Sequence, residues 1–229
     1  MSDFVYAGGE LEVFARAIRW KRYCRAQLAP YLRGRVLEVG AGLGSTTRAL
    51  FDGSQTRWVC LEPDRRLAAA APAVAGVEWR HGTSRQLDAS DVFDCILYVD
   101  VLEHIEDDRG EVAAAARHLG AGGTLVVLAP AYQWLFSPFD ARIGHHRRYS
   151  RRTLTRLAPP GLGIEKLVYL DSTGLLASAA NRLLLRQSDP TLGQILFWDR
   201  VLVPCSRVLD PLLRHALGRS VLAVWRRPA

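Results

Sequence analysis

The sequence predicts an α/β protein built on one largely parallel sheet with helices on both faces. Two observations lead to this prediction. Short apolar runs alternate with helical segments between residues 35 and 130, and a glycine-rich turn, GAGLG, follows the first apolar run directly. Strands that alternate with helices are typical of parallel sheets whose two faces are both covered. With 229 residues, of which 49% are hydrophobic, the chain can bury the core of one such domain.

A helix with one apolar face is expected first, over residues 10–31, because apolar side chains recur there at helical spacing. The run RVLEV at 35–39 follows it and ends at a glycine, the pattern of a buried parallel strand. The turn GAGLG then leads into a second helix, whose first turn contains Ser45, Thr46 or Thr47.

The same alternation continues to residue 130. Apolar runs bounded by glycine and polar residues predict strands, and the alanine-rich segments between them predict helices. The expected strands cover residues 58–62, 77–81, 93–99 and 124–130, and the expected helices cover residues 65–74 and 108–119.

The last third of the chain predicts two further strands with helices around them. Ser150 should cap a helix over 151–157. Apolar helical segments that are too short and too interrupted by charges to span a bilayer lie between the two strands. Three roles for them remain open: a lid packed on the sheet, a homodimer face, or a surface that touches a membrane. The strands are expected at 164–170 and 220–227, and the helical segments at 174–187 and 192–217.

The net charge of +7 is concentrated in the last part of the chain. Residues 1–139 contain 15 basic and 17 acidic residues, whereas residues 140–229 contain 15 basic and 6 acidic residues. Such an excess suits an anionic substrate, an anionic membrane surface or nucleic acid. Because the N-terminus lacks a secretory pattern and no apolar stretch reaches spanning length, we expect a cytoplasmic protein, with peripheral membrane contact left open.

The four cysteines are widely spaced and show no metal-type pairing, so they are expected to be buried free thiols. No metal site is predicted from the sequence. The cysteines are Cys24, Cys60, Cys95 and Cys205.

The glycine-rich turn carries the first functional signal. Gly40, Gly42 and Gly44 are spaced G-x-G-x-G, one residue shorter than the G-x-G-x-x-G of dinucleotide sites. Glu38, two residues before the first glycine, would repel a phosphate and attract an ammonium group. Glu62 ends the second strand, where a carboxylate can accept hydrogen bonds from both hydroxyls of a ribose. Together they predict a site for an uncharged or cationic nucleoside.

On these residues the chain resembles the class I S-adenosylmethionine-dependent methyltransferases. The resemblance runs through VLEVGAGLG, LEPD, HGTSRQL, FDCILYVDVLEHIEDD, LGAGGTLVVLAP and GHHRRYS. It implies a Rossmann-like sheet of strand order 3-2-1-4-5-7-6, with strand 7 antiparallel and extra helices between strands 6 and 7. It also implies one methyltransferase domain over 1–229: an N-terminal helical cap (1–34), a cofactor-binding core (35–130), and a part with the substrate lid, inserted helices and last strands (131–229).

The resemblance implies S-adenosylmethionine as the cofactor. Glu38 and the glycine loop would line its methionine part, Glu62 its ribose, and Pro63 the adenine side, while Asp100 would lie near the amino acid end and the methyl group. Many members have an aspartate after strand 3 that contacts the adenine amine, but this chain has Gly-Thr-Ser there, so Thr83 or backbone groups would take that part. The cofactor-binding candidates are Glu38, Gly40, Ala41, Gly42, Gly44, Glu62, Pro63, Thr83 and Asp100.

The polar segment FDARIGHHRRYS, residues 139–150, directly follows the fifth strand and should cover the acceptor pocket. Transfer to a hydroxyl requires removal of a proton, and histidine is the usual base because its pKa lies near neutral pH. His145 or His146 is the first candidate for this role. His104, after the fourth strand, is another, although a structural role for it is equally open.

The same segment supplies candidates for acceptor binding. Arg147 and Arg148 could hold a carboxylate or phosphate, or they could instead pair with Asp140 or Asp107. Aromatic residues after the fifth strand could line the acceptor pocket or pack the lid. The acceptor-binding candidates are Tyr132, Trp134, Arg147, Arg148 and Tyr149.

The leading functional hypothesis is methyl transfer to an oxygen or nitrogen of a small molecule, such as a secondary metabolite, a sugar or a lipid-linked glycan, with anionic character allowed. The alternative is a protein that modifies or binds nucleic acid through its basic C-terminal half. The sequence disfavours it, because DVLEHI stands where base methylases usually have an N/D-P-P-Y/F motif. A non-catalytic binding protein is a third hypothesis. Both a monomer and a homodimer remain open.

Overall fold

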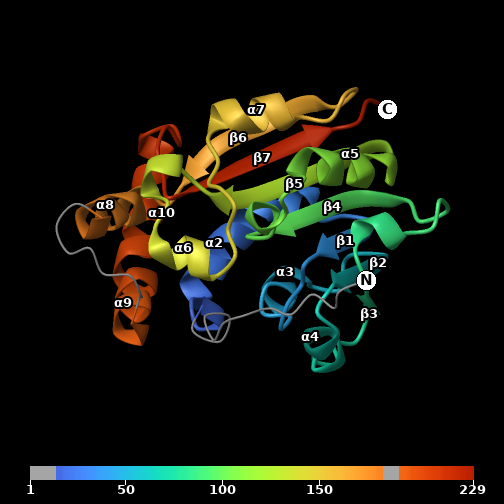
Figure 1. The fold of residues 1–229 in the computed structure, drawn as a ribbon, viewed down its shortest axis with the longest axis horizontal. Helices are drawn as coiled ribbons and strands as arrows, with labels where there is room; N and C mark the ends of the chain where they lie inside the picture. The colour runs from blue at the N-terminus through green and yellow to red at the C-terminus, as the bar shows by residue number, and fades with distance from the viewer. Residues whose placement is uncertain (1–13, 183–190) are drawn as a thin grey trace.

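Seven strands form one sheet in the order β3-β2-β1-β4-β5-β7-β6 (Figure 1). The structure is a computed structural model that describes residues 14–182 and 191–229. The observed order is the one that the resemblance to class I methyltransferases implied. The strands are β1 (Arg35–Val39), β2 (Arg57–Glu62), β3 (Val77–His81), β4 (Phe93–Val99), β5 (Leu119–Pro130), β6 (Gly163–Leu170) and β7 (Ser220–Arg226).

Strand direction in the sheet also matches the prediction. β1 to β5 pair in parallel, and β7 lies antiparallel between β5 and β6. Nearly every residue of β1, β2 and β7 is buried, as expected for strands covered on both faces. Because parallel strands end at one edge, the segments that follow β1, β2, β4 and β5 meet there.

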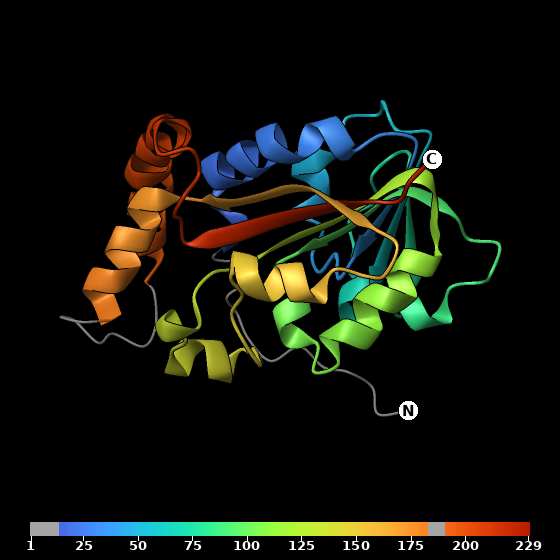
Figure 2. The same ribbon diagram turned by 90° about the horizontal axis from the view of Figure 1, so that it is seen from above.

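Helices cover both faces of the sheet (Figure 2). On one face, Leu28 of α2 packs with Trp58 in one buried cluster. On the other face, Val112 of α5 and Leu154 of α7 pack with Trp225 in a second cluster. The helices are α2 (Ile18–Leu28), α3 (Thr47–Leu50), α4 (Arg65–Ala69), α5 (Asp108–Arg117), α6 (Pro138–Arg142), α7 (Arg151–Leu157), α8 (Ser172–Ala180), α9 (Leu192–Phe197) and α10 (Val203–Leu212).

Buried aspartates tie the helices between β6 and β7 to the rest of the molecule. Asp210 on α10 accepts hydrogen bonds from the Tyr23 hydroxyl on α2 (2.7 Å) and from the Asp171 N–H (2.7 Å). Asp171 in turn accepts from the Trp198 indole and the Ser206 hydroxyl (both 2.7 Å). No described helix is long and apolar enough to cross a membrane.

Several elements differ from their predicted bounds. The helix expected over 10–31 is observed as α2 from Ile18 to Leu28. β5 begins five residues early, at Leu119, because Leu119 already pairs with Phe93 at the start of β4. α4 ends at Ala69, whereas the prediction extended it to residue 74. Pro72 explains the early end, since proline disfavours the helical conformation of the residue before it.

The C-terminal helical segments are more divided than predicted. The segment expected as one helix over 192–217 consists of α9, a π-helical turn (Trp198–Leu202) and α10, which ends at Leu212. Parts of two predicted helices, residues 10–13 and 183–187, lie outside the described residues.

Three of the four cysteines are buried, as predicted: Cys24, Cys60 and Cys95. The prediction was wrong for Cys205, which is exposed. Cys205 lies on the outer face of α10, whereas its neighbours Val203 and Ser206 face inward.

Candidate active site

The turn after β1 brings the main chain close to the turn after β4. Gly40, Gly42 and Gly44 have φ angles of 71°, 53° and 68°, in the left-handed region that favours glycine. A Cβ atom on Gly40 would lie only 2.6 Å from a methyl carbon of Val101. The Gly40 N–H donates to the Leu61 carbonyl at the end of β2 (2.8 Å). The loop therefore presents its backbone, rather than side chains, to the space in front of it.

Glu62 holds this loop in place. Its Oε2 accepts a hydrogen bond from the Gly42 N–H (2.7 Å), and its Oε1 accepts from the Asp64 N–H (2.9 Å). The residue is only 4% exposed, and burial raises the pKa of its carboxyl. Each carboxylate oxygen can accept a second hydrogen bond. Glu62 therefore fixes the loop and keeps acceptor capacity, while its contact with ribose hydroxyls stays a prediction.

Glu38 lies behind the glycine loop, inside the core. Its Oε2 accepts hydrogen bonds from the Trp58 indole (3.1 Å) and from the Cys60 thiol (3.7 Å). Burial raises the pKa of Glu38 to about 7. The contacts of this carboxyl are thus with the protein interior.

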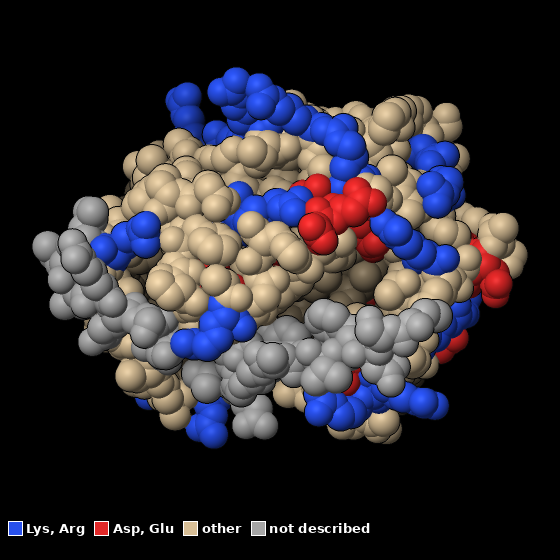
Figure 3. Space-filling view, in the orientation of Figure 1, with Lys and Arg blue, Asp and Glu red and all other residues tan. Residues whose placement is uncertain are grey.

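A cavity opens in front of the glycine loop. Its walls come from the loop, from α2, from the turn after β4 and from the segment after β5. In the space-filling view the surface is hollowed near the centre of the molecule, beneath a patch of acidic side chains (Figure 3). Of the predicted cofactor residues, four line the cavity and five do not. The lining residues are Gly40, Ala41, Gly42 and Asp100, and those outside the lining are Glu38, Gly44, Glu62, Pro63 and Thr83.

Asp100 lies where β4 enters the cavity wall. Its N–H donates to the Leu128 carbonyl (2.8 Å), and its φ of 53° is unusual for a residue with a side chain. Protein atoms surround the carboxylate, yet the cavity keeps it accessible to water. Burial raises its pKa, although the nearby His145 and Arg219 oppose this. Asp100 therefore places a carboxyl group in the wall of the cavity.

Thr83 lies away from the cavity. It is exposed, and its N–H donates to Gln86 Oε1 (2.8 Å), which caps the short turn Ser84–Gln86. Pro63 is half-buried, and its carbonyl lies 3.1 Å from the Nε2 of His81. An adenine contact for either residue stays a prediction.

Two basic residues of the cavity wall were missed by sequence reasoning. Lys21 on α2 donates to the Phe14 and Ala15 carbonyls, and burial lowers its pKa. The guanidinium of Arg219 lies 4.7 Å from the centre of the Trp198 ring, and burial lowers its pKa too. Both come from segments outside the predicted motifs. The one available signal was that Lys21 is one of only two lysines in the chain.

The structure separates the two adjacent histidines of the segment after β5. His145 lines the cavity, with its side chain 9% exposed and its Nδ1 3.0 Å from Asp140 Oδ1. His146 is exposed and lies outside the lining, and its N–H donates to the Glu103 carbonyl (2.8 Å). Of the two candidates for the base, His145 is thus the one that reaches the cavity.

The adjacent arginines also differ. Arg148 lines the cavity and donates from Nε and Nη2 to the buried carboxylate of Asp140. Burial raises the pKa of Asp140, but hydrogen bonds from His145 and Arg148 outweigh burial and hold it below its usual range. Arg147 instead pairs with Asp108 (2.8 Å) and lies outside the lining. Neither arginine takes the alternative partner Asp107, whose carboxylate binds Arg85.

Three predicted aromatic residues lie outside the cavity lining. Tyr149 is buried, and its hydroxyl donates to the Leu102 carbonyl (3.1 Å) and to Asp108 (2.9 Å). Tyr132 stacks on Tyr169 with 4.8 Å between ring centres, and Trp134 is 51% exposed. Their contribution to an acceptor site stays a prediction.

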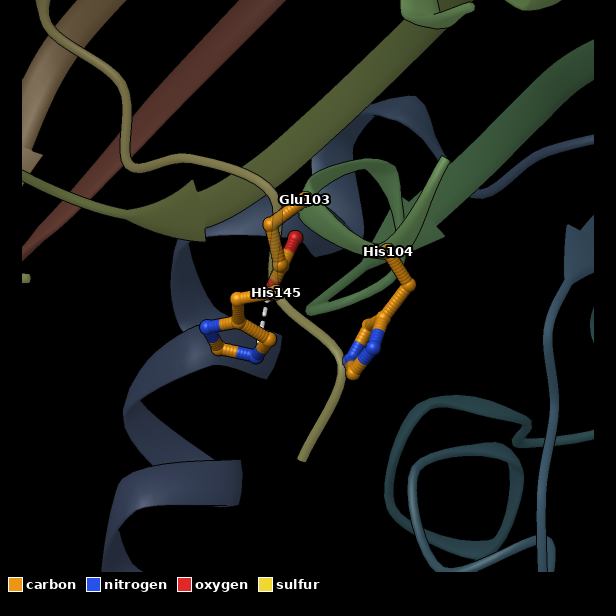
Figure 4. A group of neighbouring side chains, drawn as sticks. All are labelled: Glu103, His104 and His145. Atoms are coloured by element: carbon orange, nitrogen blue, oxygen red, sulfur yellow. Dashed lines mark ion pairs between the residues drawn. The ribbon is translucent and has the colours of Figure 1, made fainter. Parts of the chain in front are cut away.

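Glu103 and His104 lie beside His145 in the cavity wall (Figure 4). The His104 and His145 rings meet edge to face with 4.5 Å between their centres. Burial lowers the pKa of His104 to about 4, so its ring is neutral at physiological pH. Glu103 Oε1 lies 3.8 Å from His145 Nε2, and burial raises the pKa of Glu103 well above its usual range.

Sequence comparison identifies relatives among methyltransferases. A family model described as a methyltransferase domain matches residues 13–159. A demethylmenaquinone methyltransferase from Tropheryma whipplei is 32% identical over 151 residues, which are 63% of this chain and 60% of that protein. The match thus spans less than two thirds of the relative's length.

Solved structures share the fold at low sequence identity. A methyltransferase from Haloferax volcanii, described as putative and solved with the Trm112 activator, has a TM-score of 0.63 at 16% identity over 94% of each chain. The N-methyltransferase NodS from Bradyrhizobium japonicum WM9, in complex with S-adenosyl-L-homocysteine, has a TM-score of 0.57 at 18% identity, covering 91% of this chain and 87% of NodS.

Proposed function

The chain belongs to the class I S-adenosylmethionine-dependent methyltransferase family, and from that premise we propose that it transfers a methyl group to an oxygen or nitrogen of a small-molecule acceptor. The observation that carries the proposal is a single cavity wall that joins the glycine loop and Asp100 to His145 and Arg148. The residues proposed for the cofactor and those proposed for the acceptor thus line the same cavity.

The residues present fit S-adenosylmethionine. Gly40 and Gly42 line the cavity without side chains, which allows a ligand to approach the main chain closely. The remaining acceptor positions of Glu62 suit ribose hydroxyls, and the carboxylate of Asp100 suits a ligand that carries an ammonium and a sulfonium. When bound, the cofactor supplies a methyl carbon whose bond to sulfur breaks as an acceptor lone pair forms the new bond.

His145 would act on the acceptor side. Its Nδ1 hydrogen bond to Asp140 leaves Nε2 unprotonated in the neutral ring, facing the cavity wall. The proton of an acceptor hydroxyl would pass to this nitrogen as the oxygen attacks. Arg148 would hold its guanidinium beside the same site, where it favours an acceptor with anionic character. The relative that is named for demethylmenaquinone supports a small molecule as the acceptor.

Calorimetry with S-adenosylmethionine tests the cofactor site. The wild-type protein should bind it, and Glu62→Ala should bind at least about tenfold more weakly, because the change removes the ribose acceptor and releases Gly42. Glu78→Ala is the matched control, since Glu78 lies on neighbouring β3 and contacts exposed arginines instead. An absence of binding to the wild-type protein would contradict the proposal.

Methyl transfer from labelled S-adenosylmethionine to a panel of acceptors tests the substrate class. The panel should contain hydroxyl, amine, sugar and quinone compounds beside DNA and RNA. Label in a small molecule supports the proposal. Label in nucleic acid alone would contradict it and favour the alternative that rests on the basic C-terminal part of the chain.

Peripheral contact with a membrane is a finer part of the proposal. α8 to α10 carry large apolar side chains that are more than half exposed: Leu176, Phe197, Val208 and Leu212. Arginines lie on the same segments, and together they suit an anionic lipid surface. Sedimentation with vesicles that contain anionic lipid tests this contact, with uncharged vesicles as the control. Recovery of the protein in the supernatant in both cases would contradict it.

A further inference from the structure

Three side chains at the cavity wall form a cluster with the composition of a metal site. Glu103, His104 and His145 each offer one ligand atom, and these atoms lie within 4.8 Å of one another (Figure 4). Glu103 and His104 come from the turn after β4, and His145 comes from the segment after β5. One carboxylate and two imidazoles are a donor set typical of divalent first-row transition metals, whereas Mg²⁺ and Ca²⁺ prefer all-oxygen sites.

Glu103 gives the strongest indication of a missing partner. Its side chain is 0% exposed, yet neither carboxylate oxygen accepts a hydrogen bond from another residue of the described segments. Its nearest basic group is the Nε2 of His145, 3.8 Å from Oε1. A buried carboxylate without hydrogen bonds is costly, so such groups usually have a partner. A cation between Glu103 and the two rings would supply one.

The orientation of His145 also suits a metal ligand. A histidine that binds a metal through one nitrogen usually donates from the other nitrogen to a carboxylate, which fixes the ring. In this structure, Asp140 accepts the hydrogen bond from Nδ1 of His145 (3.0 Å). Asp140 in turn accepts hydrogen bonds from Ser137 and Arg148. Nε2 is therefore left to face Glu103.

We propose that Glu103, His104 and His145 bind one divalent transition-metal ion, such as Mn²⁺, Co²⁺ or Zn²⁺, which receives a hydroxyl oxygen of the acceptor. Ligand atoms at about 2.1 Å from an ion lie about 3 to 4 Å apart. The 3.8 Å between Glu103 and His145 already meets this spacing, and the other ligand atoms, which lie within 4.8 Å, would reach it by rotation of the side chains. Three protein ligands leave coordination positions open to the cavity that all three residues line.

The ion would change how the acceptor loses its proton. This consequence rests on the proposed methyl transfer, whereas metal binding itself does not. With Nε2 of His145 bound to the ion, the ion lowers the pKa of the acceptor hydroxyl, and the proton leaves to solvent water. The oxygen lone pair then forms the bond to the methyl carbon, and the electron pair of the carbon–sulfur bond stays on sulfur. No oxidant or reductant takes part.

Titration of the chelator-treated protein with Co²⁺, without cofactor or acceptor, tests the site through the visible absorption of the bound ion and through calorimetry. We expect one ion per chain. Glu103→Gln keeps the side-chain shape and should weaken binding at least about 100-fold. Asp140→Asn, which acts only through His145, should weaken it about 10- to 100-fold. His146→Ala is the matched control, because His146 is adjacent but exposed, and it should bind as the wild type does.

Four results would overturn the proposal: no Co²⁺ or Zn²⁺ binding by the wild type, wild-type affinity in Glu103→Gln, equal losses in His145→Ala and His146→Ala, or Mg²⁺ binding as tight as Co²⁺ binding. Thermal unfolding of each variant without metal separates loss of the site from loss of the fold. Failure of S-adenosylmethionine binding alone would remove the methyltransferase proposal and leave the metal site intact.

Discussion

The proposed cofactor side and the proposed acceptor side of the cavity are built in different ways. The cofactor side is mainly main chain: three glycines with left-handed φ angles, fixed by one carboxylate, Glu62, at the end of the next strand. The acceptor side is made of side chains, in which Asp140 binds both His145 and Arg148. At these glycines an added side-chain carbon strains the main chain or clashes with its neighbours, whereas the side-chain network depends on the pairing of opposite charges. The two sides should therefore fail for different reasons.

The largest effect is expected at the glycine loop. Gly40→Ala forces a Cβ against Val101 and a left-handed φ on alanine, which should cost about 3 to 5 kcal/mol of unfolding free energy and abolish cofactor binding. Gly53→Ala is the control, because Gly53 also has a positive φ of 81° but has no atom within 4 Å of the added carbon. It should cost only about 1 kcal/mol. Urea denaturation measures the unfolding free energy of both variants. Equal losses would show that backbone strain, rather than the contact with Val101, limits substitution at Gly40.

The next effect compares the adjacent arginines. Arg148→Ala leaves the buried carboxylate of Asp140 without its guanidinium and should cost about 3 kcal/mol of unfolding free energy. Arg147→Ala breaks the more exposed pair with Asp108 and should cost less than about 1 kcal/mol. Urea denaturation of both variants measures the difference. Similar losses would mean that burial of Asp140 does not set the stability of the acceptor side.

The smallest effect concerns Glu38 and pH. Its pKa is about 7 in the folded protein against 4.5 for an ordinary glutamate, so the unfolded chain releases this proton at lower pH. The contribution of Glu38 to stability should therefore fall as pH rises from 5 to 8, by about 2 kcal/mol. Glu38→Gln has no such proton, so the unfolding free energy of the variant relative to wild type should rise over this range. A constant difference between the two proteins would contradict the assigned pKa shift.

Sequence reasoning worked where a feature is local. The alternation of apolar runs and glycines predicted the strands and helices themselves, whereas their order in the sheet was implied by the family resemblance. Ser150 was correctly expected to cap α7, where it accepts a hydrogen bond from the Thr153 N–H. The backbone turn at Gly40 to Gly44 belongs to the same class, because its geometry follows from neighbouring residues. Such features depend on periodicity and on φ angles, which a sequence encodes directly.

The sequence did not predict contacts between segments that lie far apart in the chain. Nothing in GHHRRYS shows which histidine points inward, since that depends on the Asp140 carboxylate and on a bond from the His146 N–H to the Glu103 carbonyl. Arg219 enters the cavity from the segment before β7, far from every motif. The cluster of Glu103 with His104 and His145 was missed for the same reason, because its members come from two segments that only the fold brings together.

Main-chain hydrogen bonds join the two ends of the segment that follows β5. Ala131 bridges Tyr149, the Tyr132 N–H donates to the Tyr149 carbonyl (2.7 Å), and the Tyr149 N–H donates to the Pro130 carbonyl (2.9 Å). Residues 132–148 thus leave and rejoin the sheet at almost one point, and a loop of this kind can change length and composition without disturbing the strands. Acceptor preference would then depend on this loop alone. Relatives with different substrates would differ chiefly in the sequence and length of the loop between Tyr132 and Tyr149.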